Sequence, residues 1–157
     1  MRIVVFSDSH NNFFALKNIV RSRIAADYFI HLGDGAKDFE ALVQVYPSKI
    51  MYNVRGNCDW SSLEPNQGIL MCAGKKIFYT HGHIFHVKSG LEELKAHARE
   101  LDAQIVLFGH THIACTEYDN GLYLMNPGSV TSPLYGSPSY GMLDITKAGV
   151  AMNIVHL

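Results

Sequence analysis

The sequence has no excess of charge of either sign. Its 157 residues include 13 Lys and Arg against 14 Asp and Glu, a formal net charge of −1. Domains that bind nucleic acid electrostatically usually carry a basic surface, so this balance gives no strong signal for nucleic-acid binding. A small phosphorylated substrate is compatible with it, because metal ions can supply the positive charge that the side chains do not.

Cysteines are few, and long apolar runs are missing. Cys58, Cys72 and Cys115 are an odd number without paired zinc spacing, which argues against a disulfide scaffold and favours a reducing compartment. The first apolar run ends at Phe6 and is too short for a signal sequence, and no other run approaches the ~18 residues of a membrane span. We therefore expect a soluble, cytoplasmic protein with no membrane partner.

The first half of the chain alternates between strand and helix patterns. Three apolar runs are typical of strands buried on both faces of a sheet: residues 3–6, 28–32 and 49–54. Two helices are expected between them, one capped by Asn11 or Asn12 and running to Ile24, and one over residues 39–46. This β-α-β-α-β order predicts a mostly parallel sheet.

The second half is richer in strands and turns. Asn120-Gly121 is a strong signal for a type I′ hairpin turn. Ser89 followed by Glu92 predicts a capping box that opens a helix. Seven strands are expected here, over residues 68–72, 76–80, 105–108, 113–118, 122–125, 140–145 and 150–155. Since no linker or internal repeat divides the chain, we expect one domain over residues 1–157.

Polar side chains follow five of the predicted strands at the point where each strand ends. They are Asp8, His10, Asp34, Asn57, His81, His110 and His112. Loops beyond the carboxyl ends of strands in an α/β sheet converge in one crevice, so these side chains should meet there. Any one of them alone is more often a turn residue, a helix cap or a hydrogen-bonded histidine. Together they predict a metal site.

The types of side chain limit the metal. Imidazole, carboxylate and amide oxygen together suit divalent ions such as Mn²⁺, Zn²⁺, Ni²⁺ or Fe²⁺, of which we expect Mn²⁺, and they suit Ca²⁺ or Cu⁺ poorly. Seven side chains exceed the needs of one ion. Asp34 can bridge two ions ~3.5–4 Å apart, a separation typical of two-metal hydrolases.

Five short motifs in this order resemble those of the calcineurin-like metallophosphoesterases. They are Asp8-Ser9-His10, Gly33-Asp34, Gly56-Asn57-Cys58-Asp59, Thr80-His81-Gly82-His83 and Gly109-His110-Thr111-His112. The segment Asn126-Pro127-Gly128-Ser129 and the length of the chain are similar to those of the small bacterial and archaeal phosphodiesterase branch of that family.

The resemblance implies an α/β fold, a four-layer αββα sandwich of two mixed sheets flanked by helices. It places a two-metal site at the carboxyl ends of the strands. One ion would be held by Asp8, His10, Asp34 and His112, and the other by Asp34, Asn57, His81 and His110. The implied reaction is hydrolysis of small phosphodiesters, in which a hydroxide bridging the ions attacks phosphorus in line without a covalent intermediate.

The chain departs from the family pattern at one position. Many members have a histidine directly after the asparagine, placed to protonate the leaving oxygen, and here that residue is Cys58. A thiol can donate a proton but is a poorer hydrogen-bonding acid than imidazolium. His83, two residues from His81, is the other candidate for substrate contact, although a surface role is equally compatible. The predicted catalytic residues are therefore Asn57, Cys58 and His83.

Other functions are weighed against this one. His81 to His86 imitates the histidine cluster of metallo-β-lactamase-type hydrolases, but Phe85 stands where that cluster needs an aspartate. Some proteins of this fold are scaffolds in membrane-traffic coats that have lost ligands, whereas every ligand position here is filled. Phosphomonoesterase activity is a further alternative. The natural substrate, the physiological metal and the oligomeric state, a homo-oligomer included, stay open.

Overall fold

The computed structural model describes residues 1–157 and contains ten strands, three α-helices and one 3-10 turn. The strands are β1 (Arg2–Phe6), β2 (Tyr28–His31), β3 (Ile50–Asn53), β4 (Gln67–Cys72), β5 (Lys75–Thr80), β6 (Ile105–Leu107), β7 (Cys115–Asp119), β8 (Leu122–Asn126), β9 (Ser139–Thr146) and β10 (Gly149–His156). The helical elements are α1 (Phe13–Ser22), α2 (Ala36–Val45), η1 (His83–Phe85) and α3 (Glu92–Glu100). None of these helices is long and apolar enough to cross a membrane.

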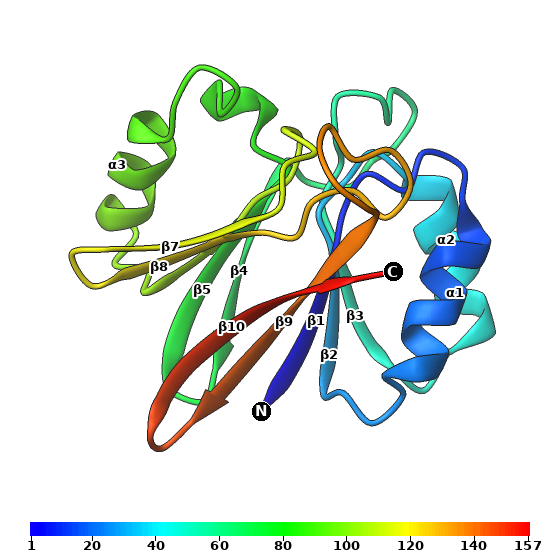
Figure 1. Cartoon of the computed structure of the whole chain (residues 1–157), viewed down its shortest axis with the longest axis horizontal. Helices are drawn as coiled ribbons and strands as arrows, with labels where there is room; N and C mark the ends of the chain where they lie inside the picture. Colours follow the sequence, from blue (N-terminus) through cyan, green and yellow to red (C-terminus); the bar gives the residue numbers. More distant parts are fainter.

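The strands form two mixed five-stranded sheets (Figure 1). The first has the order β10-β9-β1-β2-β3, in which β1, β2 and β3 are parallel and β9 runs antiparallel to β1. The second has the order β4-β5-β6-β8-β7, in which β5, β6 and β8 are parallel. The parallel sheet predicted for the first half is therefore confirmed, and the longer antiparallel strands β9 and β10 extend it at one edge.

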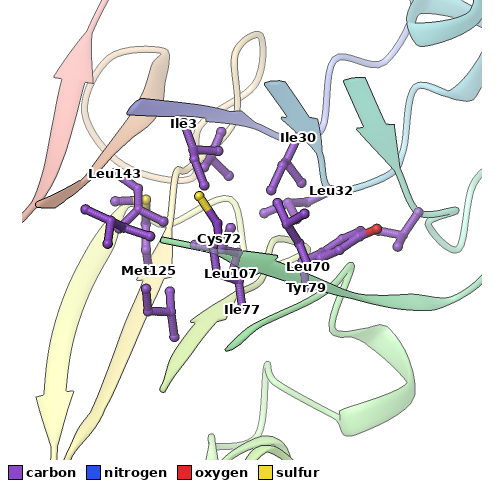
Figure 2. Packing of buried hydrophobic residues seen from close by; sticks show 14 residues of the cluster. Ile3, Ile30, Leu32, Leu70, Cys72, Ile77, Tyr79, Leu107, Met125 and Leu143 are labelled. Carbon is purple, nitrogen blue, oxygen red and sulfur yellow. The ribbon is translucent and has the colours of Figure 1, made fainter. Parts of the chain in front are cut away.

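The two sheets pack face to face, and the helices cover their outer faces. Ile3, Val5 and Ile30 of the first sheet meet Ile77 and Leu107 of the second in the cluster that Figure 2 shows. Separate apolar clusters lie under α1 and α2 on one side and under α3 on the other. This is the predicted four-layer αββα sandwich. Figure 1 shows that the loops after β1, β2, β3, β5 and β6 gather at one end of it.

The predicted cap of α1 and the predicted turn at residues 120–121 are both present. The side chain of Asn12 accepts a hydrogen bond from the Ala15 amide, as a helix cap should. Asn120 and Gly121 have φ of 46° and 89°, the positive values that a type I′ turn requires. Both predictions are confirmed.

Two local predictions were wrong. Helix α1 ends at Ser22, so Ile24 lies beyond it and is exposed. The capping box also fails to form, because Gly90 between Ser89 and Glu92 has φ of 149°. That backbone conformation belongs to glycine and cannot continue into a helix, so α3 begins only at Glu92 without a side-chain cap.

Candidate metal centre

The seven predicted ligands come from five loops at one end of the two sheets, and they form two groups. The first, which we call the Asp8 group, contains Asp8, His10 and His112. The Asp8 carboxylate Oδ1 lies 3.0 Å from Nε2 of His112 and 3.8 Å from Nε2 of His10. The two histidine Nε2 atoms are 3.4 Å apart. Three ligand atoms thus surround one small space.

The second group, called the Asp34 group, contains Asp34, Asn57, His81 and His110. Nε2 of His81 lies 3.1 Å from Oδ1 of Asn57, 3.2 Å from Nδ1 of His110 and 3.5 Å from Oδ2 of Asp34. Asp34 also reaches the first group, because oxygen atoms of Asp8 and Asp34 and a nitrogen of His81 all lie within 4.8 Å of one another. The structure therefore brings all seven predicted residues together.

Hydrogen bonds on the far side of two imidazole rings fix where their protons are. Nδ1 of His81 lies 2.7 Å from the Leu32 carbonyl oxygen, and Nδ1 of His112 lies 2.7 Å from that of Ser132. A carbonyl oxygen only accepts, so both Nδ1 atoms carry the proton and donate. In the neutral rings, each Nε2 then carries a lone pair that faces the centre. Histidines that bind metal through Nε2 use this tautomer.

This arrangement fits metal ions. Oδ1 of Asp8 is buried and has no hydrogen-bond partner, although a lone buried carboxylate oxygen is costly. This oxygen lies 3.0 Å from Nε2 of His112. Nε2 of His81 lies 3.1 Å from the Asn57 amide oxygen and 3.5 Å from the Asp34 carboxylate. Electron pairs of carboxylate, imidazole and amide groups therefore face one another. Such atoms repel unless a cation or a proton lies between them. A divalent ion in each group would satisfy them all at once.

The backbone at the ligands is strained. Five of the seven ligand residues have left-handed φ values between 44° and 68°, namely Asp8, His10, Asp34, His110 and His112. Such conformations cost of the order of 1–3 kcal/mol each in a residue other than glycine and persist only where the surroundings over-determine them. Clusters of this kind are typical of functional sites, where strain holds side chains in place.

Asp59 holds the backbone of the Asp34 group in place, a role that the sequence did not predict. Its carboxylate accepts hydrogen bonds from the backbone amides of Asp34, Gly35, Ala36 and Gly56, at 2.8–3.0 Å. It thereby ties the loop after β3 to the loop after β2 and to the start of α2. The available signal was an aspartate three residues after Gly56, the glycine that follows β3.

The segment Asn126–Ser129 braces the other histidine loop. The Asn126 side-chain amide donates to the Gly109 carbonyl and to the Thr111 hydroxyl, each at 2.9 Å. The Ser129 hydroxyl donates to the Asp8 carbonyl, also at 2.9 Å. The segment was recognised in the sequence only as a family feature. Its place in the structure shows that it holds two of the ligand loops against each other.

Cys58 and His83 lie at different parts of the centre. The Cys58 amide donates to Oδ1 of Asp34 at 2.7 Å, and its thiol lies within 4.8 Å of both Asp34 and His10 ligand atoms. The His83 ring lies 5.3 Å from that of His81, and its Nδ1 is buried without a partner. If either residue protonates a leaving oxygen, the two would do so from different directions.

In the metal-free centre, burial and neighbouring charges shift the pKa values of the titratable groups in different directions. Burial opposes the charge on Asp8, but His112 and His81, in their protonated forms, outweigh it and lower the pKa of Asp8. Asp8 in turn raises the pKa of His112. Burial, then His81 and Lys88, lower the pKa of His110 to about 4. Near neutral pH, His110 is therefore ready to bind metal without losing a proton.

The pKa of His81 is raised as well. Burial opposes its protonation, but the Asp34 carboxylate and the charge of Asp8 outweigh that effect. Burial, followed by Asp34, raises the pKa of the Cys58 thiol to about 11. The thiol is therefore protonated at neutral pH and a weak acid.

The histidine cluster of the metallo-β-lactamase type does not form. Phe85 packs edge-on against Phe78, with ring centroids 5.9 Å apart. His86 is exposed and pairs with Glu93 on the surface at 3.0 Å. Neither residue faces His81, so this alternative has no structural support.

Comparison with known proteins shows to which protein family this fold and site belong. The calcineurin-like phosphoesterase superfamily domain matches residues 1–148. The chain belongs to this superfamily. A solved structure of a conserved protein from Streptococcus pneumoniae TIGR4, described as a predicted phosphoesterase, superposes with a TM-score of 0.87 at 24% identity, over 99% of this chain and 88% of that one. At that identity it supports the fold alone.

Three relatives within and beside this superfamily show which of its members the chain is similar to. The chain is 33% identical to the probable metallophosphoesterase YsnB of Bacillus subtilis (strain 168), over 92% of this chain and 85% of that one. It is 31% identical to phosphodiesterase YfcE of Escherichia coli (strain K12), over 92% and 88%. It is also 40% identical to vacuolar protein sorting-associated protein 29 of Schizosaccharomyces pombe, over a shorter match of 66% and 60%. The protein is thus similar to small phosphoesterases of the YsnB and YfcE kind along most of its length.

Proposed function

We propose that this protein hydrolyses small phosphodiesters with two divalent ions, Mn²⁺ being the one expected. The proposal depends on one observation, the convergence of the Nε2 atoms of His81 and His112 on the buried, unpartnered Oδ1 of Asp8. Only positive charge stabilises such a set. One ion would be held by Asp8, His10, Asp34 and His112, and the other by Asp34, Asn57, His81 and His110.

Bound ions would lower the pKa of an attacking water and neutralise the phosphoryl oxygens, which favours in-line attack without a covalent enzyme intermediate. The protein's own groups supply the geometry. Asp34 lies between the two groups, and the Cys58 amide fixes its Oδ1. Asn57 is exposed, so its side chain is open to the substrate as well as to the metal. The water oxygen ends on phosphorus, and one of its protons leaves with the alcohol.

Diesters fit the charge of the site better than monoesters. A phosphomonoester brings one more negative charge, which calls for a further cationic partner. Lys37 lines the cleft beside the centre, and Lys88 is close enough to lower the pKa values of His110 and His112, but both are surface residues. The phosphodiesterase activity named for the E. coli relative supports the same choice.

A scaffold role is the rival from a different class, and the yeast relative named for vacuolar protein sorting keeps it relevant. A scaffold has no need for buried, unpartnered ligand atoms or for strained ligand backbone. Asp8 Oδ1 and the five left-handed ligand residues are therefore the features that favour an enzyme.

The experiment is a panel of diesters and monoesters assayed with metal-free protein after each divalent ion is added back. We expect turnover of bis(p-nitrophenyl) phosphate that requires added metal and is greatest with Mn²⁺, and slower turnover of p-nitrophenyl phosphate. Asp34→Asn, prepared in the same way, is the matched control for contaminating phosphatase. Absence of turnover with every ion, in protein that binds metal, would support the scaffold instead.

A further inference from the structure

A polar cleft of about 330 Å³ opens directly beside the metal centre, bounded on one side by His10 and Asp34. Most of its remaining lining is polar and comes from the loop after His10, the start of α2 and the loop after β3. One wall is different. Trp60, the only tryptophan of the chain, lines this cleft and is 91% exposed. A bare indole next to a reaction centre needs an explanation.

The backbone turn that carries the indole is anchored. Trp60 follows Asp59 directly, and the Asp59 carboxylate accepts four backbone hydrogen bonds around Asp34. The turn that carries Trp60 is closed by the Ser62 amide, which donates to the Asp59 carbonyl at 3.0 Å. Trp60 therefore stands on the same anchored turn that positions a metal ligand. Leu63, three residues on, is fully exposed but does not line the cleft.

The surroundings of the indole select the kind of group that would cover it. Large aromatic side chains gain most when a flat ring covers their apolar face. Around this face stand hydrogen-bonding groups of Asn11, Lys37, Glu40 and Ser61. A hydrocarbon ring would leave these groups without partners, whereas a heteroaromatic ring with a sugar offers partners for them. A second cleft, which Thr111 of the His110–His112 loop lines, has a mostly apolar lining, so the two clefts differ in the groups that they would bind.

We propose that Trp60 is a stacking platform for a nucleobase, so that the substrate is a phosphodiester in which one ester group is a nucleoside. The nucleoside lies in the Trp60 cleft, and its phosphate reaches the metal centre beside Asp34 and His10. Hydrolysis breaks the P–O bond to the other ester group and adds the water oxygen to phosphorus. The products are a nucleoside monophosphate in the cleft and an alcohol that carries a proton away. This inference rests on the proposed phosphodiesterase function.

The kinetic test compares two diesters with the same leaving group on the Mn²⁺-loaded protein. Thymidine 5′-(p-nitrophenyl) phosphate carries a nucleoside, and methyl p-nitrophenyl phosphate does not. The measured quantity is the ratio of their kcat/KM values. Because stacking on one aromatic side chain contributes about 5-fold to about 150-fold in affinity, Trp60→Ala should lower this ratio by that factor. Trp60→Phe should restore most of it, and Leu63→Ala is the control that should leave it unchanged.

A second readout does not depend on turnover. Since Trp60 is the only tryptophan, its fluorescence reports on this cleft alone. Adenosine 5′-monophosphate should quench it saturably, whereas ribose 5-phosphate, with the same phosphate and no base, should not. An unchanged kinetic ratio in Trp60→Ala, or equal quenching by the two monophosphates, would overturn the proposal. If wild-type protein cleaves neither diester, the proposed function fails, and base-dependent quenching still decides whether the cleft holds a nucleotide.

Discussion

The Asp34 group and the Asp8 group use similar ligands in different surroundings. The side chains of His81 and Asp34 are 0% and 3% exposed, whereas those of His10 and His112 are 30% and 24% exposed. Asp8 is fully buried and Asn57 is exposed, so the difference lies in these histidines and in Asp34. The Asp59 carboxylate accepts four backbone hydrogen bonds around the Asp34 group. The Asp8 loop is held by the Ser129 and Thr131 hydroxyls and by one hydrogen bond from Ser9 to the Asp38 carboxylate. Charge-assisted hydrogen bonds are roughly twice as strong as neutral ones, so we expect the Asp34 group, with more of them, to be the more rigid half.

This difference assigns a different task to each half. A rigid, buried set of ligands binds an ion with little reorganisation, so we expect the Asp34 group to fill first and to hold its ion more tightly. A half that water can reach exchanges its ion more easily and leaves room for substrate. We expect four measurable effects of this difference, each smaller than the one before.

The largest effect concerns the leaving group. The Cys58 thiol beside the open half has a pKa raised to about 11, so it assists a departing oxygen poorly. General acid catalysis is worth about 10²–10⁴-fold, and its absence should appear in full for a basic alkoxide. Activated aryl diesters should therefore be cleaved faster than unactivated alkyl diesters by at least that factor, measured as kcat/KM across a series of leaving groups.

Three variants identify the side from which protonation comes. Cys58→His should raise turnover of alkyl diesters if the missing acid limits the rate. Cys58→Ser should change turnover little if the thiol is a spectator. His83→Ala should selectively slow poor leaving groups if His83, beside the buried half, is the acid. A wild-type rate independent of leaving-group pKa, with chemistry confirmed as rate-limiting, would contradict the account.

The next effect belongs to Asp34, the ligand that reaches both halves. Asp34→Asn keeps the shape but removes the charge, and activity should fall by at least the ~10²–10³-fold typical of losing a strong electrostatic element. His112→Ala, which alters only the open half, should lose less and recover partly at high metal concentration. Near-normal turnover by Asp34→Asn at low metal would refute the shared-ligand assignment.

A smaller effect should follow when the support of a ligand is changed. Asp59→Asn removes the charge that four amides share, and Ser129→Ala removes one neutral hydrogen bond from the open half. Loss of such outer partners typically costs ~10–100-fold in metal affinity. We expect Asp59→Asn to lie in this range and Ser129→Ala below it, by titration calorimetry with Mn²⁺. The reverse order would mean that the rigid half is not the one proposed.

Within one pH unit of neutrality, the effect of pH is the smallest of the four. Carboxylates raise the pKa values of His81 and His112 above the usual 6.5, so both carry protons below that pH in the metal-free protein. Metal binds only the neutral rings, so affinity should fall as pH falls, by about tenfold per unit for each displaced proton. His110, with a pKa of about 4, should not contribute above that pH. Mn²⁺ occupancy that stays unchanged from pH 7 to pH 5 would contradict this.

The sequence predicted those features that depend on local pattern. The buried runs of β1 and β2 and the glycine turn at Gly121 were found because strand burial and turn conformation follow from neighbouring residues. The motif order also brought the seven ligand positions to one sheet edge before any geometry was known. Their roles as ligands stay a prediction.

Features that depend on distant contacts were missed. Ser129 supports Asp8 across 121 residues, and Asp59 caps a loop 25 residues earlier in the chain. Both residues lie in motifs that the sequence shows, but the hydrogen bonds that they make are not marked in it, because the pairing exists only once the sheets have packed. At Ser89, by contrast, a local pattern predicted a feature that the structure does not have. Its spacing to Glu92 matched a capping box, but the conformation of the intervening Gly90 decided the outcome.

The most direct test counts the metal. Protein freed of metal, reloaded with excess Mn²⁺ and desalted should contain about two ions per chain by elemental analysis, as two-metal hydrolases do. His112→Ala should retain about one, held by the Asp34 group, and Asp34→Asn should retain less than either. One ion per wild-type chain at saturation, or a His112→Ala variant that keeps as much metal as the wild type, would contradict a centre of two unequal halves joined by Asp34.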